Sequence, residues 1–289
     1  MQNFRENFKY YFVGFLVVIA IFVWYTTFTE DRNGYLTVAF LDVGQGDAVF
    51  IDAPNGNQIL IDSGVNKKVL SELGKIMPFY DRSIDVILAT HPDGDHIGGF
   101  PSVLDKFKVS TIIESGNTSG SPVYEEFNKK ANEENAKRIL ARRGQRIELG
   151  FVGENDVYLE ILFPDRDVSG LEANDASIVA KLVYGSNSFL LTGDSPKKME
   201  EYLVSLSPED LDVDVLKLGH HGSKTSTSES LVGFASPEYV IIQVGENNYG
   251  HPSPETLETL NNFEIPILRN DLLGAIIMKS DGEGVWFLR

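Results

Sequence analysis

The stretch HPDGDHIG, residues 91–98, brings four metal-binding side chains together within six positions, directly after the apolar segment 84–90. These side chains are His91, Asp93, Asp95 and His96. Imidazole and carboxylate groups are the ligands that borderline and hard divalent cations take. The Pro and Gly between them favour a turn, and a turn at a strand end directs alternate side chains toward one point. A polar surface turn is the alternative, but two of the five histidines in the chain lie here. We therefore predict a metal site.

The remaining histidines also follow predicted strands rather than being scattered along the chain. His220 and His221 lie in LKLGHHGS, residues 216–223, and His251 lies in NYGHP, residues 248–252. Asp194 ends a further apolar segment, and Asn174 precedes another. A loop role for His251 and a turn or cap role for Asn174 remain alternatives. We include all five as candidates for the same site.

The composition restricts the classes of function. With 289 residues, of which 42% are hydrophobic, the chain can form a substantial core. It contains no cysteine, which excludes disulfides and thiolate zinc sites. A net charge of −17 argues against a broad polyanion-binding surface. It does not exclude a nucleic-acid substrate at a metal site, because the cations supply local positive charge.

An apolar segment without charged side chains covers residues 10–28. Its length is near the minimum for a membrane-spanning helix, and aromatic residues lie at both of its ends. Basic residues precede it and acidic residues follow it: Arg5, Lys9, Glu30 and Asp31. The positive-inside tendency predicts a cytoplasmic N-terminus and an extracytoplasmic domain. A cleaved signal peptide is the alternative, although no small-x-small site follows. A buried soluble helix is disfavoured because a polar face is missing.

We expect a short N-terminus and anchor over residues 1–29, a linker over 30–35 and one domain over 36–289. In the first half, strands are predicted over 36–42, 48–53, 58–62 and 84–90, and helices over 67–77, 97–107 and 124–143. In the second half, strands are predicted over 177–184, 188–192, 213–218 and 239–244, and helices over 196–206, 228–235 and 254–262. Two such halves predict two sheets packed face to face with helices outside.

Five segments together resemble the metallo-β-lactamase superfamily, and within it the C-terminal hydrolase domain of ComEC-type DNA-uptake proteins. They are LDVGQGDA (41–48), LIDSG (60–64), HPDGDH (91–96), TGD (192–194) and HHGS (220–223). The superfamily turn is His-x-His-x-Asp-His, and Asp93 replaces its second histidine here. The resemblance covers about residues 36–289. It implies an α+β fold, a four-layer αββα sandwich with a two-metal site at one edge.

The resemblance also implies a ligand set. One metal is expected on His91, Asp93 and Asp194, and the other on Asp95, His96, Asp194 and His220, with Asp194 bridging. Asn174 lies near the place of a mid-chain histidine of the superfamily. The oxygen-rich set favours manganese over exclusive zinc, and zinc remains possible. Asp47 and Asp62 are expected to orient the histidines.

These features predict a membrane-anchored, outward-facing hydrolase with two divalent metal ions (Zn²⁺ or Mn²⁺). Such a site suits phosphodiester cleavage, and the resemblance favours DNA. A small or wall-linked phosphodiester and a non-enzymatic, metal-stabilised binding module are the alternatives. His221 or His251 is expected to protonate the leaving group, and Lys217 or Ser223 to contact a phosphate oxygen. ComEC-type proteins also carry a many-helix channel and an oligonucleotide-binding-type domain, so a separate DNA-uptake channel is a candidate partner.

Overall fold

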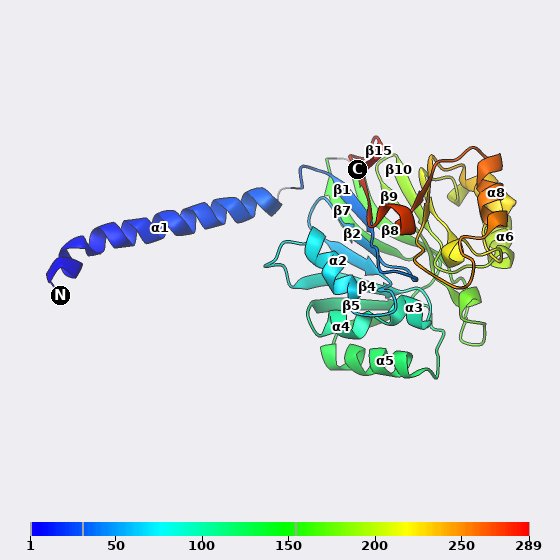
Figure 1. The fold of residues 1–289 in the computed structure, drawn as a ribbon, viewed down its shortest axis with the longest axis horizontal. Helices are drawn as coiled ribbons and strands as arrows, with labels where there is room; N and C mark the ends of the chain where they lie inside the picture. The colour runs from blue at the N-terminus through cyan, green and yellow to red at the C-terminus, as the bar shows by residue number, and fades with distance from the viewer. Residues whose placement is uncertain (1, 31, 154, 289) are drawn as a thin grey trace.

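Two β-sheets pack face to face and carry helices on their outer faces (Figure 1). The computed structural model describes residues 2–30, 32–153 and 155–288. The eight-stranded sheet contains, in spatial order, β15 (Val285–Leu288), β14 (Ile276–Ser280), β1 (Leu36–Phe40), β2 (Val49–Asp52), β3 (Gln58–Ile61), β4 (Ser83–Ala89), β5 (Lys108–Glu114) and β6 (Lys137–Leu140). The seven-stranded sheet contains β13 (Ile267–Arg269), β12 (Tyr239–Ile242), β11 (Val215–Lys217), β10 (Asn187–Leu191), β9 (Val179–Tyr184), β8 (Asn155–Phe163) and β7 (Arg146–Val152).

The helices form the two outer layers. The eight-stranded sheet is covered by α2 (Lys68–Ile76), α3 (Gly94–Ile97), α4 (Phe100–Leu104) and α5 (Pro122–Glu134). The seven-stranded sheet is covered by α6 (Lys197–Leu206), α7 (Glu229–Ala235) and α8 (Pro254–Asn262). The short helix α9 (Asn270–Leu273) follows β13, and single turns of 3₁₀ helix lie at η1 (Asn174–Ala176), η2 (Pro208–Asp210) and η3 (Gly219–Gly222). The predicted αββα sandwich is therefore confirmed.

Each central strand has two apolar faces because it lies between two layers. In β1, Val38 and Phe40 face the core between the sheets, whereas Ala39 packs with the residues under the helices. This alternation follows from the period of two along a strand. Both faces are buried, so these strands read as continuous apolar runs, which is how the sequence revealed them.

The predicted helix over 124–143 is wrong beyond Glu134. Asn135 adopts a left-handed conformation with φ of 58° and ends α5. Residues 137–140 then form β6, which pairs in parallel with β5. The predicted helix over 97–107 is divided into α3 and α4, because Gly98 and Gly99 lie against the backbone of the loop after β3. The hairpin of β7 and β8 had no counterpart in the sequence prediction.

The strand directions bring the candidate residues to one edge. β1 runs in the same direction as β3 and β4, because β1 and β3 are both antiparallel to β2, and β3 is parallel to β4. β10, β11 and β12 are parallel to one another. The segments that hold Asp47, His91, Asp194 and His221 therefore all follow the carboxyl ends of strands. Such ends are where α/β sheets gather functional side chains.

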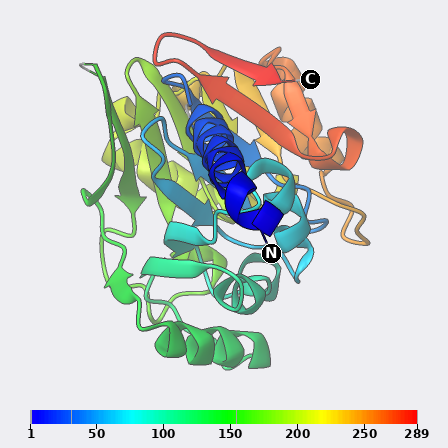
Figure 2. The ribbon, with the colours of Figure 1, turned by 90° about the vertical axis from the view of Figure 1, so that its left-hand side faces the viewer.

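The helix α1 (Gln2–Glu30) extends away from the sandwich (Figures 1 and 2). Within the described residues, its segment Asn7–Trp24 is the one helix long and apolar enough to cross a membrane, and all of it is exposed. A membrane span and a signal sequence both fit this observation. Asp31 and the side chains of Arg5, Tyr25 and Glu30, which belong to the sequence argument for a span, lie outside the described part of the chain.

Candidate metal centre

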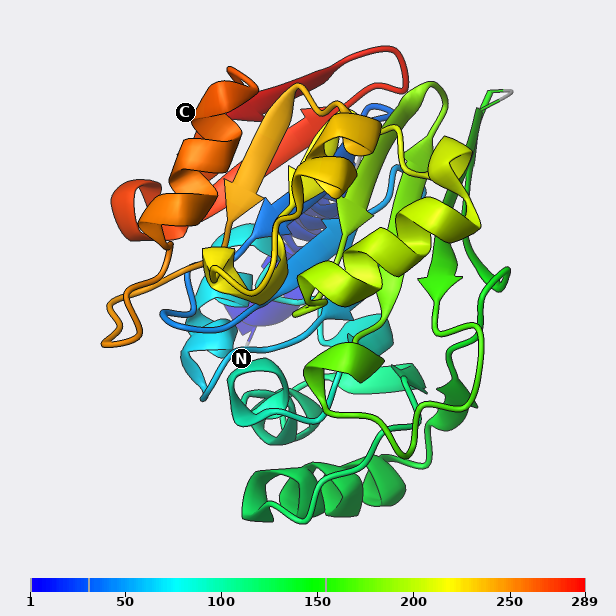
Figure 3. The same cartoon turned by 90° about the vertical axis from the view of Figure 1, so that its right-hand side faces the viewer.

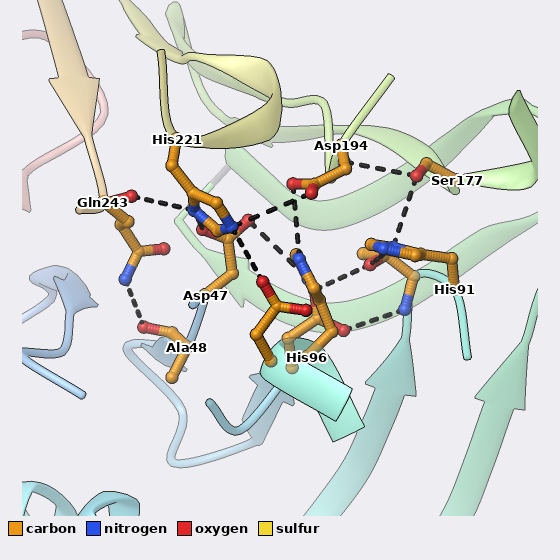
Figure 4. A network of polar contacts seen from close by, with 12 residues as sticks. Asp47, Ala48, His91, His96, Ser177, Asp194, His221 and Gln243 are labelled. Carbon is orange, nitrogen blue, oxygen red and sulfur yellow. Dashed lines mark hydrogen bonds and ion pairs between the residues drawn. The ribbon is translucent and has the colours of Figure 1, made fainter. Parts of the chain in front are cut away.

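Three histidines and one aspartate converge between the ends of the two sheets (Figure 4). His91 directly follows β4, His96 lies in α3, Asp194 follows β10 and His221 follows β11. One ligand atom each of His91, His96 and Asp194 lies within 4.8 Å of the others, and the same holds for Asp95, His96 and His221. The rings of His91 and His96 are 4.0 Å apart, and those of His96 and His221 are 5.5 Å apart. The shared His96 makes this one cluster.

The ligand atoms of this cluster are buried and aimed at one another. Nε2 of His91 has no hydrogen-bond partner among the described residues, and Nε2 of His96 and Oδ1 of Asp194 have only their 3.3 Å ion-pair contact with each other. Burying a polar atom without a partner is costly, so native structures seldom do it without a reason. Divalent cations would satisfy all three atoms, and imidazole with carboxylate is a suitable donor set. The residues present therefore fit a metal site, and the paired groups are consistent with two ions.

The opposite ring nitrogens are held by hydrogen bonds. Nδ1 of His96 lies 2.7 Å from Oδ2 of Asp62, which also accepts the hydroxyl of Thr90 at 2.7 Å. Nδ1 of His221 lies 2.9 Å from the carbonyl oxygen of Gln243 and donates to it. These contacts orient each ring so that Nε2 points into the cluster, which is the usual support for metal-binding histidines. The expected orienting role of Asp62 agrees with this geometry.

Burial and neighbouring charges shift the pKa values of the three histidines in different directions. Burial and then the charge of His96 lower the pKa of His91 to about 3, which leaves its imidazole neutral. Burial also acts to lower the pKa of His221, but the carboxylates of Asp194 and Asp47 outweigh it and raise the pKa to about 10. The pKa of His96 rises for the same reason, chiefly through Asp194 and Asp62. Protons and cations compete for these nitrogens, so metal binding is coupled to proton release.

The structure distinguishes the two adjacent histidines. His221 is 1% exposed and belongs to two of the groups that can hold a metal, whereas the side chain of His220 is 30% exposed and belongs to none. Nε2 of His220 lies 3.9 Å from Oδ2 of Asp194, and its Nδ1 lies near Thr225 and Asn174 at 3.2 and 3.4 Å. His221 is thus the buried ring of the cluster, and His220, to which the resemblance assigned the ligand position, lies at its rim.

The other sequence candidates lie around the cluster. Oδ2 of Asp93 is 3.7 Å from Nε2 of His91, on a half-exposed side chain at the rim. Nε2 of His221 is 3.3 Å from Oδ2 of Asp95. His251 lies further out, with its ring 5.5 Å from that of His220. Asn174 belongs to this outer group, with its Nδ2 3.4 Å from Nδ1 of His220.

Lys217 lies in the interior, where the sequence suggested a phosphate contact. Its side chain is 2% exposed, forms an ion pair with Asp47, and donates to the carbonyl oxygens of Gly193 and Leu218 at 3.2 and 2.9 Å. Asp47 in turn lies 3.3 Å from Nδ1 of His221. Lys217 therefore interacts with the histidines only indirectly, through its ion pair with Asp47.

Two contributors were not found from the sequence. The hydroxyl of Ser177 accepts the backbone N–H of Asp194 at 3.2 Å and lies 3.3 Å from Nδ1 of His91. The side chain of Gln243 donates to the carbonyl oxygen of Ala48 at 2.9 Å and so ties β12 to the loop that carries Asp47. Ser177 follows Asn174 in the segment already singled out, but a serine at a strand start has no distinctive signal. Gln243 stands out only as an amide at the end of an apolar strand.

The fold and this cluster define a class, and comparison with known proteins agrees. The metallo-beta-lactamase superfamily model matches residues 41–245, so the chain belongs to that superfamily. CmlA, a diiron beta-hydroxylase from Streptomyces venezuelae, superposes with a TM-score of 0.55 at 12% identity, over 88% of this chain and 54% of CmlA. At that identity the likeness shows the fold alone.

Two curated relatives are more similar in sequence. The ComE operon protein 3 of Bacillus subtilis is 32% identical over 196 residues, which is 68% of this chain and 24% of the relative. The competence protein ComA of Neisseria gonorrhoeae is 33% identical over 196 residues, which is 68% of this chain and 25% of the relative. The chain thus spans about a quarter of the length of these relatives. The chain is related to competence proteins through this one domain.

Proposed function

We propose that this chain is a metal-dependent phosphodiesterase that cleaves DNA outside the cytoplasmic membrane. The observation that carries the proposal is the buried cluster in which His91, His96 and Asp194 present buried ligand atoms to one another. The similarity to proteins named for competence directs the choice of substrate toward DNA. The apolar helix α1 supports an anchor with the catalytic domain on the outer side.

The proposed ligands fall into two groups that share Asp194. His91 and Asp93 complete the first, and Asp95, His96 and His221 complete the second. Bound divalent cations would supply an activated water and charge stabilisation for the attacking and leaving oxygens. The oxygen-rich first group accepts Mn²⁺ as well as Zn²⁺. Lys217 contributes by holding Asp47, which faces His221.

His251 and Asn174 are proposed to contact the substrate from the outer side of the cluster. Burial and the charge of His220 lower the pKa of His251, so its imidazole is neutral near pH 7. Its Nδ1 is buried without a hydrogen-bond partner in the described structure. A buried N–H without an acceptor is less favourable than a buried lone pair, so the proton belongs on Nε2. Nε2 of His251 can then donate a hydrogen bond to a phosphate oxygen or to the leaving-group oxygen, whereas a neutral imidazole is too weak an acid to transfer its proton to the leaving group.

The experiment that tests the proposal uses the full chain in detergent with Mn²⁺ or Zn²⁺. Single-stranded DNA, double-stranded DNA and bis(p-nitrophenyl) phosphate are compared as substrates. We expect DNA cleavage that Asp194→Ala abolishes together with most of the bound metal. Asp105→Ala is the matched control, because Asp105 forms only a surface ion pair with Lys130. Hydrolysis of the small diester alone would favour a small phosphodiester substrate, and metal binding without any hydrolysis would favour a binding module.

A second comparison tests the ligand set. His221→Ala is expected to lower metal affinity far more than His220→Ala, because His221 is buried in the cluster and His220 lies at its rim. Metal content after dialysis measures this difference. Greater metal loss in His220→Ala would restore the assignment that the resemblance implied.

A further inference from the structure

The loop between β12 and α8 carries an aromatic side chain out from the cluster into solvent. Figure 3 shows this connection leaving the body of the domain. Tyr249, in this loop, is 77% exposed, among the most exposed large side chains of the sandwich. A single exposed aromatic side chain is common on protein surfaces, so any role of Tyr249 depends on what lies beside it.

A succession of neighbouring rings links Tyr249 to the cluster. Ring centroids are 5.5 Å apart between His96 and His221, 6.1 Å between His221 and His220, and 5.5 Å between His220 and His251. The last step, from His251 to Tyr249, is 5.8 Å with the two ring planes tilted by 32°. Tyr249 is thus the outermost member of a line of rings that begins at the metal-binding side chains.

The side chain of Asn247 makes four hydrogen bonds to the backbone of this loop. Oδ1 of Asn247 accepts the backbone N–H groups of Tyr249 and His251 at 3.0 and 3.1 Å. Nδ2 of Asn247 donates to the carbonyl oxygens of Gly245 and His251, both at 2.9 Å. Four hydrogen bonds therefore fix the backbone on both sides of the ring. Such preorganisation lowers the entropy cost of using the ring for binding.

The charges beside this loop give a nucleic acid little electrostatic attraction. A groove of about 660 Å³ runs beside it, and its charged residues are Asp42, Lys68, Glu246 and Asp271. Lys68, the one cation among these residues, is paired with Asp42 at 2.9 Å. The net charge of the chain is −17. Away from the metal ions, a nucleic-acid chain must be held here by something other than phosphate–cation contacts.

We propose that Tyr249 is a stacking subsite for a nucleobase beside the scissile phosphodiester, with His251 lining the path between that base and the cluster. The inference rests on the proposed function and adds to it a preference for unpaired bases. Stacking on an aromatic ring is tolerant of sequence and needs a base that is free of its partner strand. Single-stranded DNA is therefore the substrate that this subsite fits.

The test compares two single-stranded substrates of equal length with the metal-loaded full chain in detergent. One is oligothymidylate, and the other carries abasic tetrahydrofuran residues in place of the nucleosides. Wild type is expected to show a KM for the first that is about 5- to 100-fold lower, the range that one stacked base contributes. Tyr249→Ala should lose this preference and Tyr249→Phe should keep it. Phe151→Ala is the control, since Phe151 is a 72% exposed aromatic on β7.

A binding measurement without catalysis completes the test. In Tyr249→Trp, oligothymidylate should quench the fluorescence of the new indole, and the abasic oligomer should not. An unchanged preference in Tyr249→Ala, or equal quenching by both oligomers, would overturn the stacking subsite while leaving DNA cleavage intact. Absence of DNA cleavage by wild type, with hydrolysis of bis(p-nitrophenyl) phosphate retained, would instead overturn the proposed function and the subsite with it.

Discussion

Replacing Lys217 with methionine tests the buried ion pair behind the metal centre. Methionine keeps most of the apolar stem and removes the ammonium group. Asp47, which is 1% exposed, would then keep two histidines as nearby positive partners: its Oδ1 lies 3.3 Å from Nδ1 of His221, and its Oδ2 lies 3.9 Å from Nδ1 of His96. The carbonyl oxygen of Leu218 would also lose the ammonium donor, and that of Gly193 would keep only the backbone N–H of His220 at 3.4 Å. Removing one member of a buried pair typically costs about 3–5 kcal/mol, a large part of the stability of one domain.

Equilibrium unfolding in guanidinium chloride, with residues 30–289 in chelator at pH 7, measures this cost. We expect Lys217→Met to lower the free energy of unfolding by about 3–5 kcal/mol. The double variant with Asp47→Asn should be less destabilised than the sum of the single variants, by about 1–3 kcal/mol. The cost should also shrink at pH 5, because an unpaired buried Asp47 takes up a proton more readily.

Lys130→Met is the matched control for the loss of an ammonium group. Lys130 pairs with Asp105 at 2.7 Å on the surface, where water and salt screen the ion pair, so its loss should change stability little. A cost below about 1 kcal/mol for Lys217→Met, or strict additivity with Asp47→Asn, would refute the reasoning. Lys217 would then be an ordinary buried side chain rather than the counter-ion of the centre.

Three further predictions follow from the geometry. In chelator, the thermal midpoint of unfolding should fall as the pH rises from about 6.5 toward 10. Protonated His221 stabilises the metal-free fold below its unfolded pKa, and this contribution is lost as the pH rises through its folded pKa of about 10. His221→Asn should flatten this pH dependence and His220→Asn should not; equal slopes in both variants would contradict the assignment. Gly46→Ala should reduce bound metal, measured by elemental analysis, because a Cβ there would clash with the carbonyl oxygen of Asp95 at a φ of +129°, while Gly120→Ala, which has open space, should bind normally. The full chain should fractionate with membranes, and protease added to intact cells should digest its catalytic domain. Residues 30–289 alone should be soluble and active. Protection of the domain from protease until the cells are lysed would place it on the cytoplasmic side of the membrane.

The pattern of apolar runs was enough to predict the layers of the sandwich. Strands such as β4 and β10 are buried on both faces toward their carboxyl ends, so each ends in an uninterrupted apolar run, and the turn at 91–98 follows the end of β4. The residues at which helices and strands begin and end were harder to predict from the sequence. Residues 137–140 have the composition of a polar helix, yet they form β6 because Asn135 turns the chain and β5 offers an edge to pair with.

The identities of most ligand candidates could be read from the sequence, because His and Asp gather after strands for chemical reasons that do not depend on packing. The sequence did not show which of these side chains contact one another. His220 and His221 are adjacent and both adopt left-handed φ values, 50° and 53°, so their side chains leave the chain in different directions. The buried ring of His221 is held by the carbonyl oxygen of Gln243, which directly follows β12, and by the carboxylates around it: Asp47, Asp95 and Asp194.

The same distinction applies to Lys217. As a sequence feature it is a cation beside two histidines, which suggests a phosphate contact. In the tertiary structure it ends β11 in one sheet, and Asp47 follows β1 in the other. The sequence by itself therefore determined the fold class, the apolar N-terminal segment and the chemistry of the centre, since these depend on residue type and spacing. Only the packing of one sheet on the other decided which side chains face each other, because that depends on strand direction and burial across long separations in the chain.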